Sequence, residues 1–184
     1  GWAMDIGAHI GGLAIPMALD NQGLRVVAVE AVPENADLCR KNAELNHVAD
    51  RVIVKTNWAA APGVATGLCH YGYRGPAEAS DGYVSAHRFI GWTWGDQGEA
   101  ARPEHAIDTP AVSIDSLMAE FGIEDVTLIK IDCEGCEWSF LDTPAVAKVQ
   151  TIIGEFHGRP TAKHPMDRLR ELLPDHDVTR WDDG

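Results

Sequence analysis

Hydrophobic residues in this chain follow two patterns that alternate along the sequence. Continuous apolar runs of strand length, typical of sheets covered on both faces, occupy a run that ends at Asp5 and residues 25–30, 52–56, 126–132 and 151–156. Stretches in which apolar residues recur with the period of a helix lie between or after these runs, at residues 13–19, 33–46, 115–121 and 165–173. A last short strand is expected at 178–181.

This alternation predicts an α/β fold, doubly wound and Rossmann-like, with a mostly parallel sheet and helices on both faces. Asp115 is expected to cap its helix and Gly122 to end it. Ligands bind such sheets beyond the carboxyl ends of the strands. Four polar side chains that are far apart in the sequence are therefore expected to meet at one rim: Asp5, Glu30, Asp132 and His157.

The first strand leads into a turn that contains glycines at positions 7, 11 and 12. Gly7 and Gly11 let the backbone turn sharply and let a ligand approach the main chain, and the first amides of the next helix are expected to face that space. Asp5 would repel a pyrophosphate at this place, so it suits a ligand with positive charge or hydroxyl groups. Glu30 ends the second strand about 20 residues later, the spacing at which an acidic residue meets ribose hydroxyls.

Residues 59–110 differ from the rest of the chain, since they are rich in Gly and Ala, carry scattered Tyr and Trp residues and show little helical periodicity. A connection of this length predicts hairpins or a lid, inserted between the third and fourth strands. The aromatic side chains either contact a substrate or pack an extra hairpin layer, and the sequence leaves both open.

Composition narrows the classes of partner. The 184 residues suffice for a single domain (1–184), and because the chain begins inside a strand we expect an N-terminal segment to be missing. The net charge of −13 disfavours nucleic acid and anionic membranes as partners. Four cysteines without a signal peptide or a membrane-spanning run predict a cytoplasmic protein with reduced thiols. A homo-oligomer is compatible with the sequence, which does not decide the oligomeric state.

Five blocks of sequence resemble those of S-adenosylmethionine-dependent methyltransferases of the FkbM family. They recur in order over most of the chain, at residues 5–11, 29–35, 113–117, 128–137 and 152–157. The first block is shared by many methyltransferases, whereas the fourth is much more particular to this family. This chain departs from the family pattern at His9, where Asn is common, and at Cys133 and Cys136, which fill small positions of the fourth block.

The resemblance implies a class I methyltransferase fold, S-adenosylmethionine as cofactor, and methylation of a hydroxyl on a small molecule such as a sugar or natural product. Carried over residue by residue, it places the methionine and ribose beside the glycine turn, the ribose diol on Glu30, the adenine after the third strand, and the sulfonium next to Asp132. The cofactor-binding residues so implied are Asp5, Gly7, His9, Gly11, Glu30, Ala31, Asn57, Trp58 and Asp132.

Methyl transfer to a hydroxyl needs alignment of oxygen, methyl and sulfur and the removal of one proton. Asp132 is the first candidate for orienting or deprotonating the acceptor, with Glu134 and His157 next. The alternative roles are a helix cap for Asp132, a structural role for Glu134 and Glu137, and a solvated strand end for His157. Lys130 shares a face with Asp132, so either an ion pair or a substrate contact is expected for it.

Other chemistries are disfavoured. A magnesium site on Asp132, Glu134 and Glu155 would need side chains whose convergence the spacing does not show, and a zinc site at the Cys133/Cys136 pair would lack a second cysteine pair. We therefore predict no metal. An NAD-dependent oxidoreductase would share the glycine turn and Glu30 but not the spacing of the glycines. A non-catalytic module that only binds the cofactor stays open.

Overall fold

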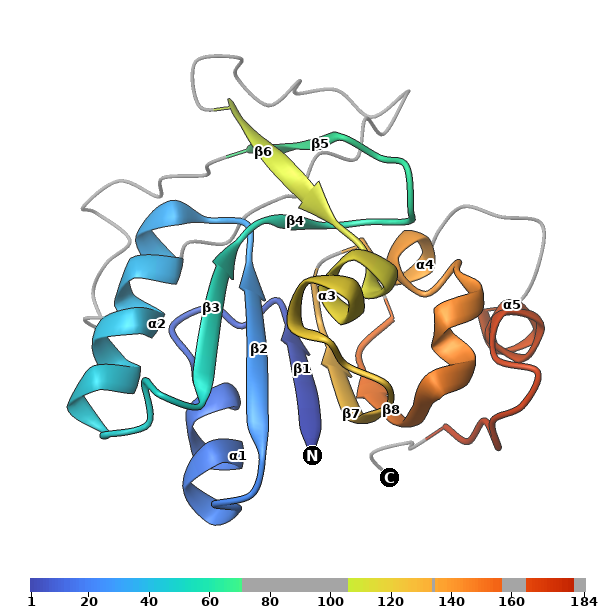
Figure 1. Cartoon of the computed structure of the whole chain (residues 1–184). Coiled ribbons are helices and arrows are strands. Elements are labelled where there is room, and N and C mark those ends of the chain that lie inside the picture. Colours follow the sequence, from blue (N-terminus) through green and yellow to red (C-terminus); the bar gives the residue numbers. More distant parts are fainter. Residues whose placement is uncertain (71–105, 134, 157–164, 181–184) are drawn as a thin grey trace.

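The computed structural model describes residues 1–70, 106–133, 135–156 and 165–180, which form a layered α/β structure (Figure 1). In chain order its strands are β1 (Trp2–Ile6), β2 (Arg25–Glu30), β3 (Val52–Thr56), β4 (Trp58–Ala59), β5 (Thr66–His70), β6 (Ala106–Val112), β7 (Val126–Ile131) and β8 (Val149–Gly154). Its helices are α1 (Ala14–Asp20), α2 (Pro33–Leu45), α3 (Ile114–Phe121), α4 (Glu137–Phe140), the 3-10 helix η3 (Pro144–Lys148) and α5 (Pro165–Leu172).

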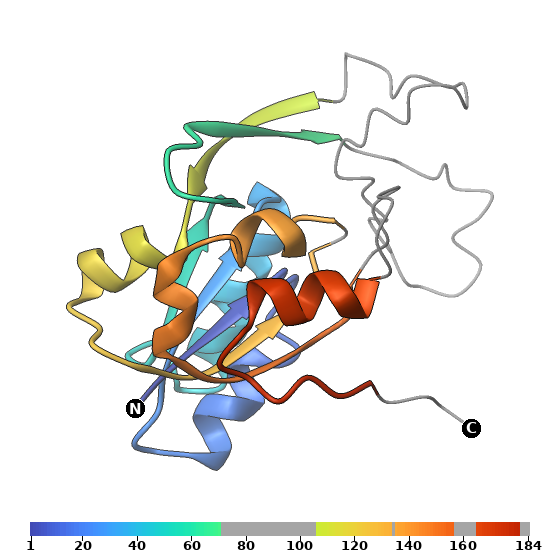
Figure 2. The same ribbon diagram turned by 90° about the vertical axis from the view of Figure 1, so that its right-hand side faces the viewer.

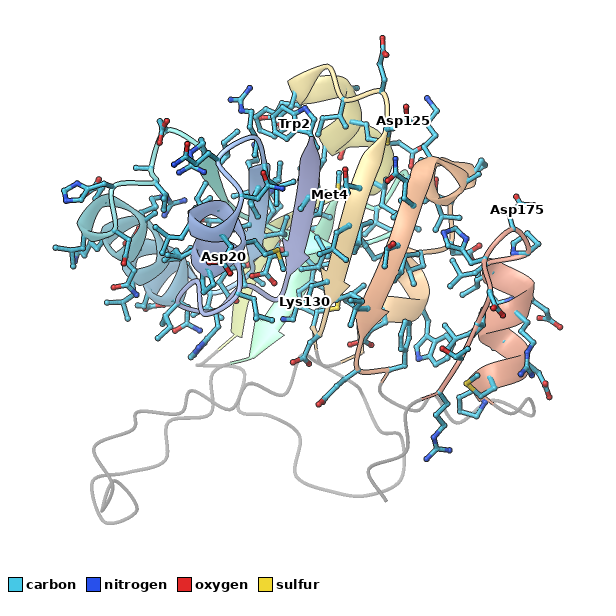
Figure 3. The ribbon with its side chains drawn as sticks, turned by 90° about the horizontal axis from the view of Figure 1, so that it is seen from below. Trp2, Met4, Asp20, Asp125, Lys130 and Asp175 are labelled. Atoms are coloured by element: carbon cyan, nitrogen blue, oxygen red, sulfur yellow. A yellow bond between two sulfur atoms is a disulfide. The ribbon has the colours of Figure 1, made fainter. Side chains whose placement is uncertain are left out.

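The main sheet has five strands in the order β3-β2-β1-β7-β8, and every neighbouring pair is parallel. β1 lies in the centre, where Asp5 is in register with Ala28 of β2 and Lys130 of β7. Figure 3 shows Trp2 and Lys130 towards opposite ends of these central strands. The predicted doubly wound parallel fold is confirmed, and it brings the carboxyl ends of β1, β2 and β7 to one rim.

Two hydrophobic cores cover the two faces of this sheet. Met4 and Ile6 of β1 point into the larger core, which is closed by α3, α4, η3 and α5. Ala3 points the other way, into the smaller core beneath α1 and α2. This division follows from the alternation of side chains along a strand, which sends successive residues to opposite faces.

A second, three-stranded sheet, which we call the upper sheet, has the order β4-β6-β5. β5 and β6 are antiparallel, whereas β4 and β6 are parallel. Figures 1 and 2 show it beyond the carboxyl ends of the main strands. β5 and β6 are the two ends of the insertion expected at 59–110; its central part, 71–105, lies outside the described residues, and its role as a lid stays a prediction.

Two predicted details of secondary structure are wrong. The cap of α3 is Ser113, not Asp115, because the Ser113 hydroxyl accepts the Ser116 amide while the Ser116 hydroxyl accepts the Ser113 amide. Residues 178–180 form no strand, since Val178 packs against the larger core instead of pairing with a strand; residue 181 lies outside the described part. None of the helices in the described residues is long and apolar enough to cross a membrane.

Candidate cofactor site

Gly7 stands at the rim, between the ends of β2 and β7. Its amide donates to the Val29 carbonyl at 2.9 Å, and its φ of +76° is in the left-handed region. A Cβ on Gly7 would lie 1.9 Å from the Asp132 carbonyl oxygen and 3.3 Å from the Cys133 Cα. Only glycine allows β1 to end in such close contact with the main chain that follows β7.

The turn after Gly7 has two more left-handed positions, His9 with φ 52° and Gly11 with φ 90°. A Cβ on Gly11 would lie 2.9 Å from the Sγ atom of Cys39, so the turn packs directly on α2. His9 is exposed, and His, like Asn and Asp, is several-fold enriched among the non-glycine residues at left-handed positions. The glycine pattern read from the sequence therefore corresponds to a turn that needs it.

Asp5 is completely buried and links three segments. Its Oδ2 atom accepts the Ala14 amide, the first of α1, at 2.9 Å, and its Oδ1 atom lies 3.4 Å from the Lys130 Nζ atom. The Ala14 amide is therefore not free to bind a ligand. This differs from the expectation that the first amides of this helix face the ligand space. Burial raises the pKa of Asp5, and the positive charge of Lys130 opposes this shift.

Lys130 forms the ion pair expected from the strand periodicity, but with Asp5 on the neighbouring strand β1 and not with Asp132, which directly follows β7. Its Nζ atom also donates to the Gly7 carbonyl at 3.2 Å. The sequence pattern places residues on faces but does not show which neighbouring strand supplies the partner. Lys130 thus holds the end of β1 from the side of β7.

Glu30 is the carboxylate that ends β2, and it is buried. Its Oε2 atom accepts the His9 amide at 2.8 Å and its Oε1 atom accepts the Val32 amide at 2.9 Å. A carboxylate has about four acceptor positions, so each oxygen keeps one for a hydroxyl donor. The two amides hold the side chain at the rim, next to the glycine turn.

Asp132 follows β7 and is half-buried. Its amide donates to the Ile6 carbonyl at 3.0 Å, and its charge contributes to the raised pKa of Asp5. It does not cap the following helix, because α4 begins after Cys136 without a side-chain cap. Burial of the Cys39 thiol raises its pKa to about 11, and the negative charges of Asp5 and Glu30 add to this shift. Asp5, Glu30 and Asp132 thus stand on or just after three neighbouring strands, whereas Glu134 and His157 lie outside the described residues.

A side chain of α4 stabilises the turn between β7 and α4 by hydrogen bonds to its main chain. Glu137 is completely buried, and its Oε1 atom accepts the amides of Cys133 and Gly135, both at 3.1 Å. Its role here is structural, one of the two alternatives left by the sequence. Cys133 and Cys136 form a disulfide, which corrects the expectation that all four cysteines are reduced. Their separation of three positions along the chain also suits a disulfide, a pairing that the sequence analysis above does not consider.

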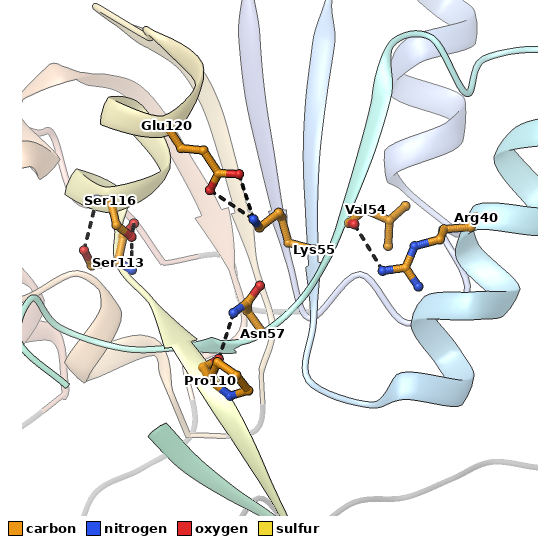
Figure 4. A network of polar contacts seen from close by, with 8 residues as sticks. All are labelled: Arg40, Val54, Lys55, Asn57, Pro110, Ser113, Ser116 and Glu120. Atoms are coloured by element: carbon orange, nitrogen blue, oxygen red, sulfur yellow. Dashed lines mark hydrogen bonds and ion pairs between the residues drawn. The ribbon is translucent and has the colours of Figure 1, made fainter. Parts of the chain in front are cut away.

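The upper sheet is attached to the rim through three of the predicted cofactor-binding residues. The Thr109 hydroxyl donates to the Ala31 carbonyl at 3.4 Å, and the Asn57 side chain donates to the Pro110 carbonyl at 2.9 Å (Figure 4). The Trp58 ring packs on Gly67, where a Cβ would lie 2.2 Å from the indole. Thr109 was missed by sequence reasoning, because nothing in residues 59–110 indicates which polar residue returns to the rim.

This arrangement favours one kind of ligand. Glu30 and Asp132 can accept hydroxyl donors, and the negative charge that they and the buried Asp5 place at three adjacent strands attracts positive charge and repels phosphate groups. Among the described residues, no group of three or more His, Cys, Asp or Glu side chains is placed to hold a metal ion. Glu155, one of the ligands considered for magnesium, is exposed.

Comparison with known proteins identifies the family. The chain matches the family described as Methyltransferase FkbM domain over residues 5–178. The chain belongs to this FkbM methyltransferase family. Its cofactor is accordingly S-adenosylmethionine, as the sequence blocks implied. None of the curated proteins matches the chain significantly.

Solved structures similar to this FkbM domain include two methyltransferases in complex with S-adenosyl-L-homocysteine (SAH). An RNA methyltransferase from Salinibacter ruber is 32% identical over 30% of this chain and 36% of its own, with a TM-score of 0.29. An O-methyltransferase from Bacillus cereus is 21% identical over 83% of this chain and 48% of its own, with a TM-score of 0.41. The FkbM domain thus spans less than half the length of either structure.

Proposed function

We propose that this FkbM methyltransferase transfers the methyl group of S-adenosylmethionine to a hydroxyl oxygen of a small molecule. The observation that supports this most is the placement of Glu30, whose buried carboxylate is held by two main-chain amides at the rim with acceptor positions left over. A carboxylate that accepts both hydroxyls of a ribose makes charge-assisted hydrogen bonds, which a partly desolvated site strengthens.

Some of the other rim residues would contact the cofactor, and others would hold those residues in position. Gly7, His9 and Gly11 would border the methionine and ribose, and Asn57 and Trp58 the adenine. Asp5 is better suited to positioning, since it is completely buried and already engages Ala14 and Lys130. We propose that it holds the glycine turn in shape without meeting the cofactor.

The chemical step is an in-line displacement. The acceptor oxygen attacks the methyl carbon, the carbon–sulfur bond breaks, and sulfur keeps the electron pair as S-adenosylhomocysteine forms. We propose that Asp132, half-buried at the tip of β7, orients the hydroxyl and receives its proton. Glu134 and His157 remain candidates for the same task. The acceptor is proposed to be a small molecule, since a net charge of −13 disfavours nucleic acid and anionic membranes.

Calorimetric titration with S-adenosylmethionine, S-adenosylhomocysteine and NAD tests the binding part of this proposal. Glu30→Gln should weaken S-adenosylhomocysteine by about 1–3 kcal/mol, since an amide side chain cannot accept on both sides. Glu44→Gln is the matched control: it removes the same charge from an exposed position of α2 and should leave affinity unchanged. Tight binding of NAD alone, or equal affinity of wild type and Glu30→Gln, would overturn the proposal.

Turnover on a panel of hydroxyl compounds tests the catalytic part. Asp132→Asn should bind S-adenosylhomocysteine nearly as wild type does and lower the methylation rate, because the amide can orient a hydroxyl but cannot take its proton. A normal rate in this variant would remove Asp132 from the chemistry. Cofactor binding by the wild type without turnover on any acceptor would favour a non-catalytic binding module.

A further inference from the structure

The disulfide between Cys133 and Cys136 lies in the turn that carries Asp132, and methyl transfer uses neither sulfur. The two Cα atoms are 5.5 Å apart, within the range of ordinary disulfides. Both residues are buried, with 6% and 4% of their surfaces exposed. They belong to the same core as Ile6 and Ile131, the last residues of β1 and β7.

This turn is in direct contact with the glycine turn of the cofactor site. A Cβ on Gly7 would fall 1.9 Å from the Asp132 carbonyl oxygen and 3.3 Å from the Cys133 Cα, so no free space separates the two segments. The Cys133 amide is also bonded to Glu137, at 3.1 Å. A displacement of Cys133 is therefore transmitted to Gly7 on one side and to the start of α4 on the other.

Reduction of the disulfide imposes such a displacement. Two sulfur atoms that are no longer bonded separate to van der Waals distance, which is about 3.5–4 Å already for two carbon atoms. Cys133 and Cys136 are packed in a core, where added volume is accommodated by shifts of backbone and side chains. The shift acts on the main chain beside Gly7, which is the wall of the cofactor site.

We infer that Cys133 and Cys136 form a reversible redox site that sets the affinity of this enzyme for its cofactor, with tighter binding in the disulfide form. The inference rests on the cofactor site proposed above. The reductant is a dithiol: one of its thiolates attacks one protein sulfur, forms a mixed disulfide and releases the other protein thiolate, which takes up a proton. The second thiol of the reductant then attacks the mixed disulfide. The protein gains two electrons and two protons, and the reductant becomes a disulfide.

Thermodynamic linkage makes this coupling reciprocal. If the disulfide form binds S-adenosylhomocysteine more tightly by some factor, saturating S-adenosylhomocysteine shifts the equilibrium constant for reduction by the same factor. Both effects are measured on the wild-type chain, so they do not depend on whether a cysteine variant folds.

The redox state is measured first. The full chain is equilibrated in buffers of reduced and oxidised dithiothreitol, quenched with an alkylating reagent in denaturant, and weighed by mass spectrometry. Reducing buffers should give four alkylated cysteines and oxidising buffers two, with peptide mapping placing the protected pair at 133 and 136. Four alkylated cysteines in every buffer, or protection of another pair, would overturn the proposal.

Affinity for S-adenosylhomocysteine is then measured in both redox states. The dissociation constant should rise threefold or more on reduction, and saturating S-adenosylhomocysteine should shift the reduction equilibrium equally. The double variant Cys133→Ser/Cys136→Ser retains Cys39 and Cys69, so its affinity should be the same in both buffers. Equal affinities of the two wild-type forms would defeat the redox proposal and leave the cofactor site standing. Absence of binding in both forms would defeat the proposed function and this inference together, while alkylation would still report the disulfide.

Discussion

Replacement of Gly7 by alanine tests the structural basis of the cofactor site most directly. The new Cβ would lie 1.9 Å from the Asp132 carbonyl oxygen and 2.8 Å from its carbonyl carbon. Both are backbone atoms, and the Asp132 amide is bonded to Ile6 at 3.0 Å, so no flexible side chain can give way. The φ of +76° adds a conformational penalty for any residue with a Cβ.

The expected cost combines two effects. A left-handed conformation costs an alanine about 1–2 kcal/mol. Forcing an extra carbon into a packed site costs typically about 1–3 kcal/mol more. The Gly7→Ala variant should therefore lose roughly 2–5 kcal/mol of unfolding free energy. Its affinity for S-adenosylhomocysteine should also fall, because the clash is relieved only by moving the end of β1 away from Asp132.

Urea denaturation followed by circular dichroism measures the first effect, and calorimetry the second. Gly12→Ala is the matched control, since Gly12 is exposed in the same turn and nothing lies within 4 Å of its hypothetical Cβ. That variant should change the unfolding free energy by no more than about 1 kcal/mol. The reasoning is refuted if Gly7→Ala unfolds within 1 kcal/mol of wild type, or if Gly12→Ala is equally damaging.

Two further predictions concern stability alone. Burial raises the folded-state pKa of Asp5 above 3.8, so the folded state binds the Asp5 proton more tightly than the unfolded state does. The contribution of Asp5 to stability is therefore lost as the pH rises through this folded-state pKa. The unfolding free energy of wild type minus that of Asp5→Asn should thus decrease from acid towards neutral pH in urea titrations, and a constant or increasing difference would contradict the raised pKa. Ser113→Ala, which removes the cap of α3, should cost about 1 kcal/mol in the same assay; an unchanged midpoint would mean that the capping box contributes nothing.

The family could be assigned from the sequence because its signals are local. The strand runs, the glycine turn and the acidic strand ends each depend on residues close together in the chain, and parallel packing then brings the strand ends to one rim. The rim positions of Asp5, Glu30 and Asp132 were predicted in this way. Where the prediction erred locally, at the cap of α3, the backbone is still extended at Ser113 and becomes helical directly after it, two positions before Asp115.

What each rim side chain binds was decided by the tertiary structure. Lys130 pairs with Asp5 and not Asp132, because β1 is its neighbour across the sheet. Thr109 reaches Ala31 because the upper sheet folds back over the rim, a contact between residues 78 positions apart. Cys133 and Cys136 bond because the turn after β7 brings their Cα atoms to 5.5 Å, and Gly7 contacts that turn only when β1 and β7 have paired. Sequence periodicity records which face a residue occupies; the identity of its partner depends on how distant segments pack, and that information is absent from any single stretch of chain.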